Sequence, residues 1–166
     1  MSNQKRRDAA LFVLCALVLV ILIAETAHAL DPNHTYYLYE ESQAPQSCLW
    51  HETLENHPVA LTLSSVAQGC RVFHFSAAAT LEATTSITNP KRTGWCVTAG
   101  SGRGNDGDLI QLVPCHGKAN QVWHETENGQ LRGMNGKCLV RGEGSQLVLG
   151  PCQRGIRWRP RVWTPD

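Results

Sequence analysis

The sequence predicts an all-β protein built from three repeated units. Short segments typical of strands alternate with turn residues, and the same order recurs roughly every 40 residues, which is the spacing of a repeated supersecondary unit. No segment carries a sustained apolar period of 3.6 residues, so long amphipathic helices are not expected. Cysteines punctuate the chain in the same rhythm, with two in each unit.

The first 29 residues are interpreted as a secretory signal peptide. Lys5, Arg6 and Arg7 form a positive start, residues 9–24 are an apolar run, and residues 27–29 match the A-x-A cleavage pattern. The run has 16 residues, fewer than the roughly 20 needed to cross a bilayer. Cleavage after residue 29 is therefore favoured over a retained signal anchor. The prediction is a secreted protein with one domain over residues 30–166 and no stable membrane span.

Charge and modification signals in the mature chain are modest. The leader holds three of the 15 basic and two of the 14 acidic residues, which leaves 12 of each. A balanced chain has no overall field to attract nucleic acid or an anionic membrane, so neither is an expected partner. Asn33 begins an Asn-x-Thr sequon and is a predicted glycosylation site if the source is eukaryotic.

The cysteine count indicates disulfides. Cys15 leaves with the leader, and an even number of cysteines remains, as is usual for a secreted disulfide-bonded domain. Six cysteines alone leave many pairings open. The six are Cys48, Cys70, Cys96, Cys115, Cys138 and Cys152.

The first unit spans about residues 36–76. An aromatic run at 36–39 is typical of a strand, and Pro45 interrupts the chain after it. Residues 59–63 form an apolar strand, and residues 71–75 alternate apolar and polar side chains as a half-buried strand does.

The second unit spans about residues 80–129. It opens with a Thr-rich, β-type stretch at 80–87. Cys96 and Val97 then start a strand, and a Gly-rich loop leads to a further strand at 109–113. The unit closes at Gln121-Val122-Trp123.

The third unit spans about residues 130–166. Residues 130–134 and 137–140 are its first two predicted strands, and a Gly-rich turn separates the second from residues 146–149. Residues 158–163 form the closing strand. In all three units a cysteine followed by an apolar residue precedes a loop, an apolar strand and a second cysteine.

The segment 96–123 resembles one repeat of the ricin B-type lectin family. The signature of that family is a Gln-x-Trp strand end behind a Cys-to-Cys loop, and Gln121-Val122-Trp123 supplies it here. The resemblance implies a β-trefoil of three four-stranded repeats, each with one internal disulfide. The implied pairs are Cys48–Cys70, Cys96–Cys115 and Cys138–Cys152.

The resemblance also implies where sugar would bind. A family repeat uses an Asp two residues after its first Cys, a Gln and an aromatic residue before its second Cys, and an Asn-Gln pair that opens the Gln-x-Trp motif. Amides and a carboxylate bond sugar hydroxyls while the ring packs on the apolar sugar face. In the second unit Gln111, Asn120 and Gln121 match, and they are the candidate ligand-binding residues. Thr98 and Val113, however, stand at the Asp and aromatic positions.

The other units depart further from the pattern. The third has Val140, Val148 and Gly150 at the Asp, Gln and aromatic positions, and the first has Trp50 and Val66 at the Asp and Gln positions. In the second unit, Trp123 is expected to fill the core. Gln121 is expected either to contact a ligand or to bond the backbone.

No catalytic, cofactor or metal motif has the residues and context that its chemistry requires, so no enzyme activity, cofactor or metal ion is predicted. Residues 102–107 match G-x-G-x-x-G literally, but a predicted strand follows them where a dinucleotide site needs a helix. His51 and His57 are six residues apart, whereas a zinc-binding helix places two histidines four apart.

Arginines gather near the C-terminus, at Arg154, Arg157, Arg159 and Arg161. On a strand most of them share one face. A solvated outer face is the favoured interpretation, and a basic patch for a sulfated or sialylated glycan or an acidic partner is the alternative.

The resulting functional prediction is a secreted carbohydrate-binding domain that recognises glycans of glycoproteins or glycolipids. The alternative is a lectin-like trefoil that has lost its sugar site and acts through another protein, as an accessory or delivery subunit of a secreted toxin or as a receptor ligand. A trefoil protease inhibitor is a third possibility, disfavoured because the Gln-x-Trp unit belongs to the ricin pattern.

Overall fold

The computed structural model describes residues 30–32, 34–41, 46–54, 58–85 and 90–164. The predicted signal peptide at 1–29 and the predicted glycosylation site at Asn33 lie outside these residues. Within the described ranges there are thirteen strands, four short 3-10 helices and no α-helix, which confirms the all-β prediction. No helix in these ranges has the length and apolar character needed to span a membrane.

Twelve of the strands fall into three sets of four by their connections, and the second and third strands of each set form a hairpin. The first four are β1 (Thr35–Glu40), β2 (Ser47–Trp50), β4 (Thr62–Ser65) and β5 (Val72–Phe75). The next four are β6 (Leu81–Thr84), β7 (Arg92–Ala99), β8 (Ile110–Pro114) and β9 (His124–Glu125). The last four are β10 (Leu131–Arg132), β11 (Cys138–Arg141), β12 (Leu147–Gly150) and β13 (Trp158–Val162). The 3-10 helices are η1 (Val66–Gln68), η2 (Ala119–Gln121), η3 (Met134–Gly136) and η4 (Cys152–Arg154).

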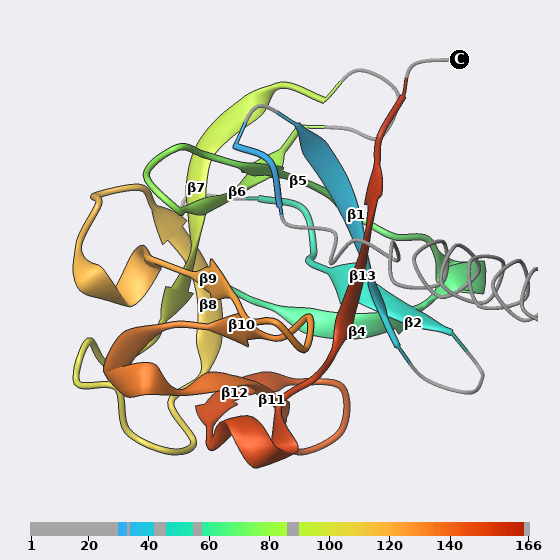
Figure 1. Ribbon diagram of the computed structural model, residues 1–166. Coiled ribbons are helices and arrows are strands. Elements are labelled where there is room, and N and C mark those ends of the chain that lie inside the picture. The colour runs from blue at the N-terminus through green and yellow to red at the C-terminus, as the bar shows by residue number, and fades with distance from the viewer. Residues whose placement is uncertain (1–29, 33, 42–45, 55–57, 86–89, 165–166) are drawn as a thin grey trace, which may run out of the picture.

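Six of these strands close into a barrel. Antiparallel ladders join β13 to β1, β1 to β5, β5 to β6, and β9 to β10. Two isolated bridges complete the ring, Thr80 with Val122 and Gln130 with Arg157. In Figure 1, β13 runs beside β1, so the last strand closes the barrel against the first.

Three hairpins, β2–β4, β7–β8 and β11–β12, carry the other six strands. In each hairpin the residue after the first cysteine lies opposite a leucine: Leu49 opposite Leu63, Val97 opposite Leu112, and Leu139 opposite Leu149. Three further fully buried residues, Leu61, Ile110 and Leu147, precede these leucines by two positions. Because the same positions are apolar each time, the hairpins meet on one core.

The three disulfides are those that the sequence predicted. Cys48–Cys70, Cys96–Cys115 and Cys138–Cys152 have Cα–Cα separations of 5.6, 5.0 and 4.9 Å. Each ties the start of a hairpin to the chain that leads back to the barrel.

Two predicted strands are corrected by the structure. Residues 59–63 do not form one strand, because β3 (Val59–Ala60) pairs with β8 while β4 pairs with β2. The break falls at Leu61, which is fully buried and donates its N–H to the Ile110 carbonyl. Gln121-Val122-Trp123 is also not a continuous strand, since Gln121 ends η2 and Val122 forms a single bridge with Thr80.

The outer edge of β13 is protected by a proline. Glu41 donates its N–H to the Arg157 carbonyl, and Trp163 donates its N–H to the Thr35 carbonyl. The backbone N–H and C=O groups of the odd-numbered residues of β13 therefore point toward β1. The N–H groups of even-numbered residues point to the opposite edge, where Pro160 has none to offer. This limits unwanted strand pairing at the edge.

Candidate functional site

Gln121 is buried and fully bonded within the protein. Its side chain is 0% exposed. Its Oε1 accepts hydrogen bonds from the His116 and Gly117 N–H groups at 2.8 and 3.1 Å. Its Nε2 donates to the Thr98 hydroxyl at 2.9 Å and to the Pro114 carbonyl at 3.1 Å. In this structure Gln121 fastens the loop after Cys115 to β7 and offers no surface to solvent.

Thr98, at the position where the family has a carboxylate, is also an internal residue. It is 2% exposed, and its hydroxyl donates to the Cys96 carbonyl at 2.8 Å while it accepts from Gln121. Trp123 lies in the core as predicted, fully buried, with its indole N–H on the Val97 carbonyl at 2.9 Å.

Gln111 and Asn120 are the two predicted ligand residues that reach the surface. Gln111 lies on β8 directly opposite Thr98, and its side chain is half-buried. Asn120, on η2, donates from Nδ2 to the Ala99 carbonyl at 3.2 Å, which leaves its Oδ1 able to accept. The structure therefore brings both amides to the same end of β7, with Gln121 behind them.

A groove that the sequence did not predict lies on the β2–β4 hairpin. It has a volume of about 310 Å³. Its lining consists of one aromatic ring, one leucine and four hydroxyl or amide side chains: Trp50, Thr62, Leu63, Ser64, Gln68 and Ser145. Trp50 is half-buried, and the Arg71 guanidinium lies 5.9 Å from its ring centroid. The Ser64 hydroxyl donates to the Gln68 side-chain oxygen at 3.3 Å.

The strand register corrects the assignment of this site. Trp50 lies opposite Thr62, as Thr98 lies opposite Gln111, so Thr62 and not Val66 stands at the Gln position. Val66 begins η1 and is 42% exposed. A fixed distance before the second cysteine, Cys70, leads to Val66 as the Gln position. In the structure η1 adds residues between β4 and Cys70, so the true Gln position lies further from that cysteine. Trp50 is identified by its distance from Cys48, but the sequence does not reveal η1.

The corresponding place on the third hairpin is filled. Val140 is 3% exposed and lies opposite Val148. A Cβ atom at Gly150 would lie 2.9 Å from a Val140 methyl carbon, so this position has no room for an aromatic ring. No polar side chain occupies the three family positions here.

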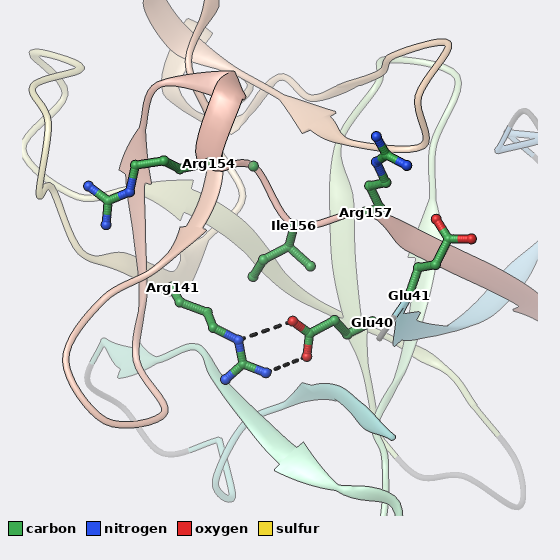
Figure 2. A pocket seen from close by; sticks show the side chains of 7 residues that line it. Glu40, Glu41, Arg141, Arg154, Ile156 and Arg157 are labelled. Atoms are coloured by element: carbon green, nitrogen blue, oxygen red, sulfur yellow. Dashed lines mark hydrogen bonds and ion pairs between the residues drawn. The ribbon is translucent and has the colours of Figure 1, made fainter. Parts of the chain in front are cut away.

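Beside it, a larger pocket of about 470 Å³ opens between the end of β1 and the start of β13. Its lining residues are Glu40, Glu41, Arg141, Arg154, Gly155, Ile156 and Arg157. Glu40 forms a two-bond ion pair with Arg141, drawn in Figure 2. Figure 2 also shows the Arg154 and Arg157 side chains extending away from Ile156 in different directions.

In the part of the chain that the structure describes, no group of three His, Cys, Asp or Glu side chains lies close enough together to hold a metal ion. The Trp50 groove and the surface at Gln111 and Asn120 present amides, hydroxyls and one aromatic ring, which are groups able to bind polar ligands.

A family comparison matches residues 83–164 to the ricin-type β-trefoil lectin domain. Among curated proteins, the ribosome-inactivating protein PMRIPm of Polygonatum multiflorum is 40% identical over 70 residues, which are 39% of this chain and 12% of that protein. Polypeptide N-acetylgalactosaminyltransferase 9 of Macaca fascicularis is 33% identical over 87 residues, 46% of this chain and 14% of that one. The matched segments thus cover only a small part of either relative's length.

Solved structures are similar over most of the chain. The β-trefoil lectin of the Vibrio vulnificus hemolysin/cytolysin, solved with N-acetyl-D-lactosamine, has a TM-score of 0.61 at 14% identity, covering 82% of this chain and 99% of that one. The Polyporus squamosus lectin, bound to a sialylated epitope, has a TM-score of 0.58 at 16% identity, covering 80% and 50%. At this identity the likeness shows the fold, and that fold is the predicted β-trefoil.

Proposed function

Because residues 83–164 match the ricin-type β-trefoil lectin domain, we propose that the chain binds carbohydrate on glycoproteins or glycolipids without acting as an enzyme. The proposal includes secretion, since three disulfides persist in oxidising compartments and a signal-like leader precedes the domain.

The Trp50 groove is the observation that carries the proposal. A half-buried indole offers a flat apolar face, and the rim presents the hydroxyls of Thr62 and Ser64 and the amide of Gln68. A pyranose ring needs this combination, because one face of the ring is apolar C–H surface and its edge is hydroxyl groups. The groove is open, so we expect a terminal or exposed sugar to bind weakly.

A second site is proposed at Gln111 and Asn120. Their amides lie at the same end of β7 and can each bond a sugar hydroxyl, with Gln121 as the residue that positions the loop behind them. Val113 supplies no aromatic face. This site therefore lacks the stacking contribution and should be the weaker of the two.

The test is a glycan array of the disulfide-bonded protein, followed by titration of any ligand found. Trp50→Leu and Gln68→Ala should each reduce binding at the groove, while the matched glutamine change Gln111→Ala should leave it unchanged. Loss of binding in Gln111→Ala and Asn120→Asp, with Trp50→Leu unaffected, would move the site to the second unit.

An array on which the folded protein binds no glycan would contradict the proposal. The remaining candidate would then be a lectin-like trefoil that works through another protein subunit.

A further inference from the structure

The last part of the chain carries an unbalanced row of arginines. Between residues 144 and 164 there is no acidic residue, while Arg154, Arg157, Arg159 and Arg161 all fall there. All four are exposed. Trp158, between the second and third, is buried at 4% exposure, which confirms that the strand turns its arginines outward.

The outward face of β1 places tyrosines beside this row. Tyr37 lies opposite Arg161, and Tyr39 lies opposite Arg159. Both tyrosines are on the outward face of β1, because the buried residues Tyr36 and Leu38 take the inward positions. The Arg161 guanidinium lies 5.1 Å from the Tyr39 ring centroid. The two tyrosine rings are 6.1 Å apart. Rings and guanidinium groups therefore form one continuous surface, here called the arginine row: Tyr37, Tyr39, Arg157, Arg159 and Arg161.

Carboxylates of the protein neutralise the surface only in part. Glu41 forms an ion pair with Arg159 at 2.6 Å, and Glu40 forms an ion pair with Arg141. Within the described residues, no ion pair involves Arg157, and Arg161 has the Tyr39 ring as its neighbour. The neighbouring Arg154 is likewise exposed at the adjacent pocket. Five arginines thus face two glutamates on this side of the barrel.

The geometry of the row suits an extended anion better than a single small one. Alternate residues of a strand are about 6.7 Å apart, so the guanidinium groups are spread along a line. Figure 2 shows Arg154 and Arg157 extending apart, so they do not converge on one bound ion. Guanidinium groups bond sulfate oxygens in pairs, and tyrosine rings can lie against sugar rings between the charges.

We propose that the arginine row binds a linear sulfated polysaccharide. This goes beyond the proposed glycan grooves, because the row lies on the β1–β13 face of the barrel and uses charge where the Trp50 groove uses an aromatic ring and hydroxyls. Neither site requires the other.

The test measures binding of the full disulfide-bonded chain to heparin, to desulfated heparin and to single-stranded oligothymidine. Heparin should bind with a dissociation constant that rises steeply with salt, and desulfated heparin should not bind. Arg157→Gln with Arg161→Gln should weaken heparin binding about tenfold at physiological salt, and should lower the slope of log affinity against log salt by about two.

The matched control removes two exposed positive charges elsewhere, Lys91→Gln with Arg103→Gln, and should change heparin binding by less than about twofold. Trp50→Leu should have no effect on heparin. Glu41→Gln releases Arg159 and should strengthen heparin binding, a gain that misfolding cannot mimic.

Equal losses in the two charge-removing pairs would overturn the proposal, since they would show a general charge effect. Binding of desulfated heparin, or of oligothymidine as tightly as heparin, would also overturn it. A failure here leaves the Trp50 groove untouched, and a failure of that groove leaves the row untouched.

Discussion

The Nε2 amide of Gln121 donates a hydrogen bond of 2.9 Å to the hydroxyl of Thr98, and both side chains are buried. The hydroxyl in turn donates to the Cys96 carbonyl, so the pair links the loop after Cys115 to the first disulfide-bonded position of β7. A residue expected at a sugar site therefore serves as an internal brace.

Gln121→Ala should lower the free energy of unfolding by about 3 kcal/mol, because it leaves the N–H groups of His116 and Gly117 without their acceptor. Denaturant unfolding under non-reducing conditions measures the loss. The matched change Gln111→Ala removes a half-buried glutamine and should cost less than about 0.5 kcal/mol. Equal costs for the two glutamines would contradict the bracing role.

Removing any one disulfide, with both cysteines replaced by Ala, should lower the free energy of unfolding by about 3 kcal/mol. The sequence separations are 22, 19 and 14 residues, and in the chain-entropy model this range changes the effect by only about 0.4 kcal/mol. Unfolding of the three double variants, compared with the parent protein, checks the prediction. A spread of several kcal/mol would show that local packing outweighs loop closure.

The repeat pattern explains why the fold could be predicted from the sequence. Cys48, Cys96 and Cys138 each precede an apolar residue that pairs with a leucine, and this regularity survives differences in loop length. The local pairing of the cysteines was implied by the resemblance to the ricin B-type repeat, and the structure has the same three pairs. The break at Leu61 was missed because apolar residues continue through it, and only the change of pairing partner from β8 to β2 defines it.

The candidate site could be predicted only in part, for physical reasons. Spacing identified Gln111, Asn120 and Gln121 as candidate ligand residues, but burial is a tertiary property, and it separates Gln121 from the other two. The Trp50 groove was missed because η1 shifts the count from Cys70. Sequence order does not show which residues an irregular turn inserts.

Stability should fall on mild acidification, in part because of His51. Its side chain is 3% exposed, with Nδ1 2.5 Å from the Glu52 carbonyl and Nε2 without a hydrogen-bond partner. Burial lowers the pKa of His51 below its ordinary value of 6.5, an effect opposed by the bond to Glu52 and reinforced by Arg71. Burial also lowers the pKa of His74, and Arg92 adds to the effect.

A lowered folded-state pKa means that the unfolded chain takes up the proton first as the pH falls below about 6.5. The stability is therefore complete above that pH and is lost as the pH falls toward the folded-state pKa values. His51→Phe should flatten the loss measured by denaturant unfolding between about pH 7.5 and about pH 5, leaving the share of His74. An unchanged slope in His51→Phe would refute the assignment.

Gly133 should be intolerant of a side chain because of Trp123. A Cβ atom at Gly133 would lie 2.6 Å from the indole carbon Cζ3, and this ring is fully buried and held by its bond to the Val97 carbonyl. Gly133→Ala should therefore lower the free energy of unfolding by about 2 kcal/mol through overpacking. In a Trp123→Phe background the smaller ring leaves room, so most of that cost should disappear. Unfolding of the parent, both single variants and the double variant gives the coupling energy, and additive costs would show that the glycine is required for a reason other than the indole.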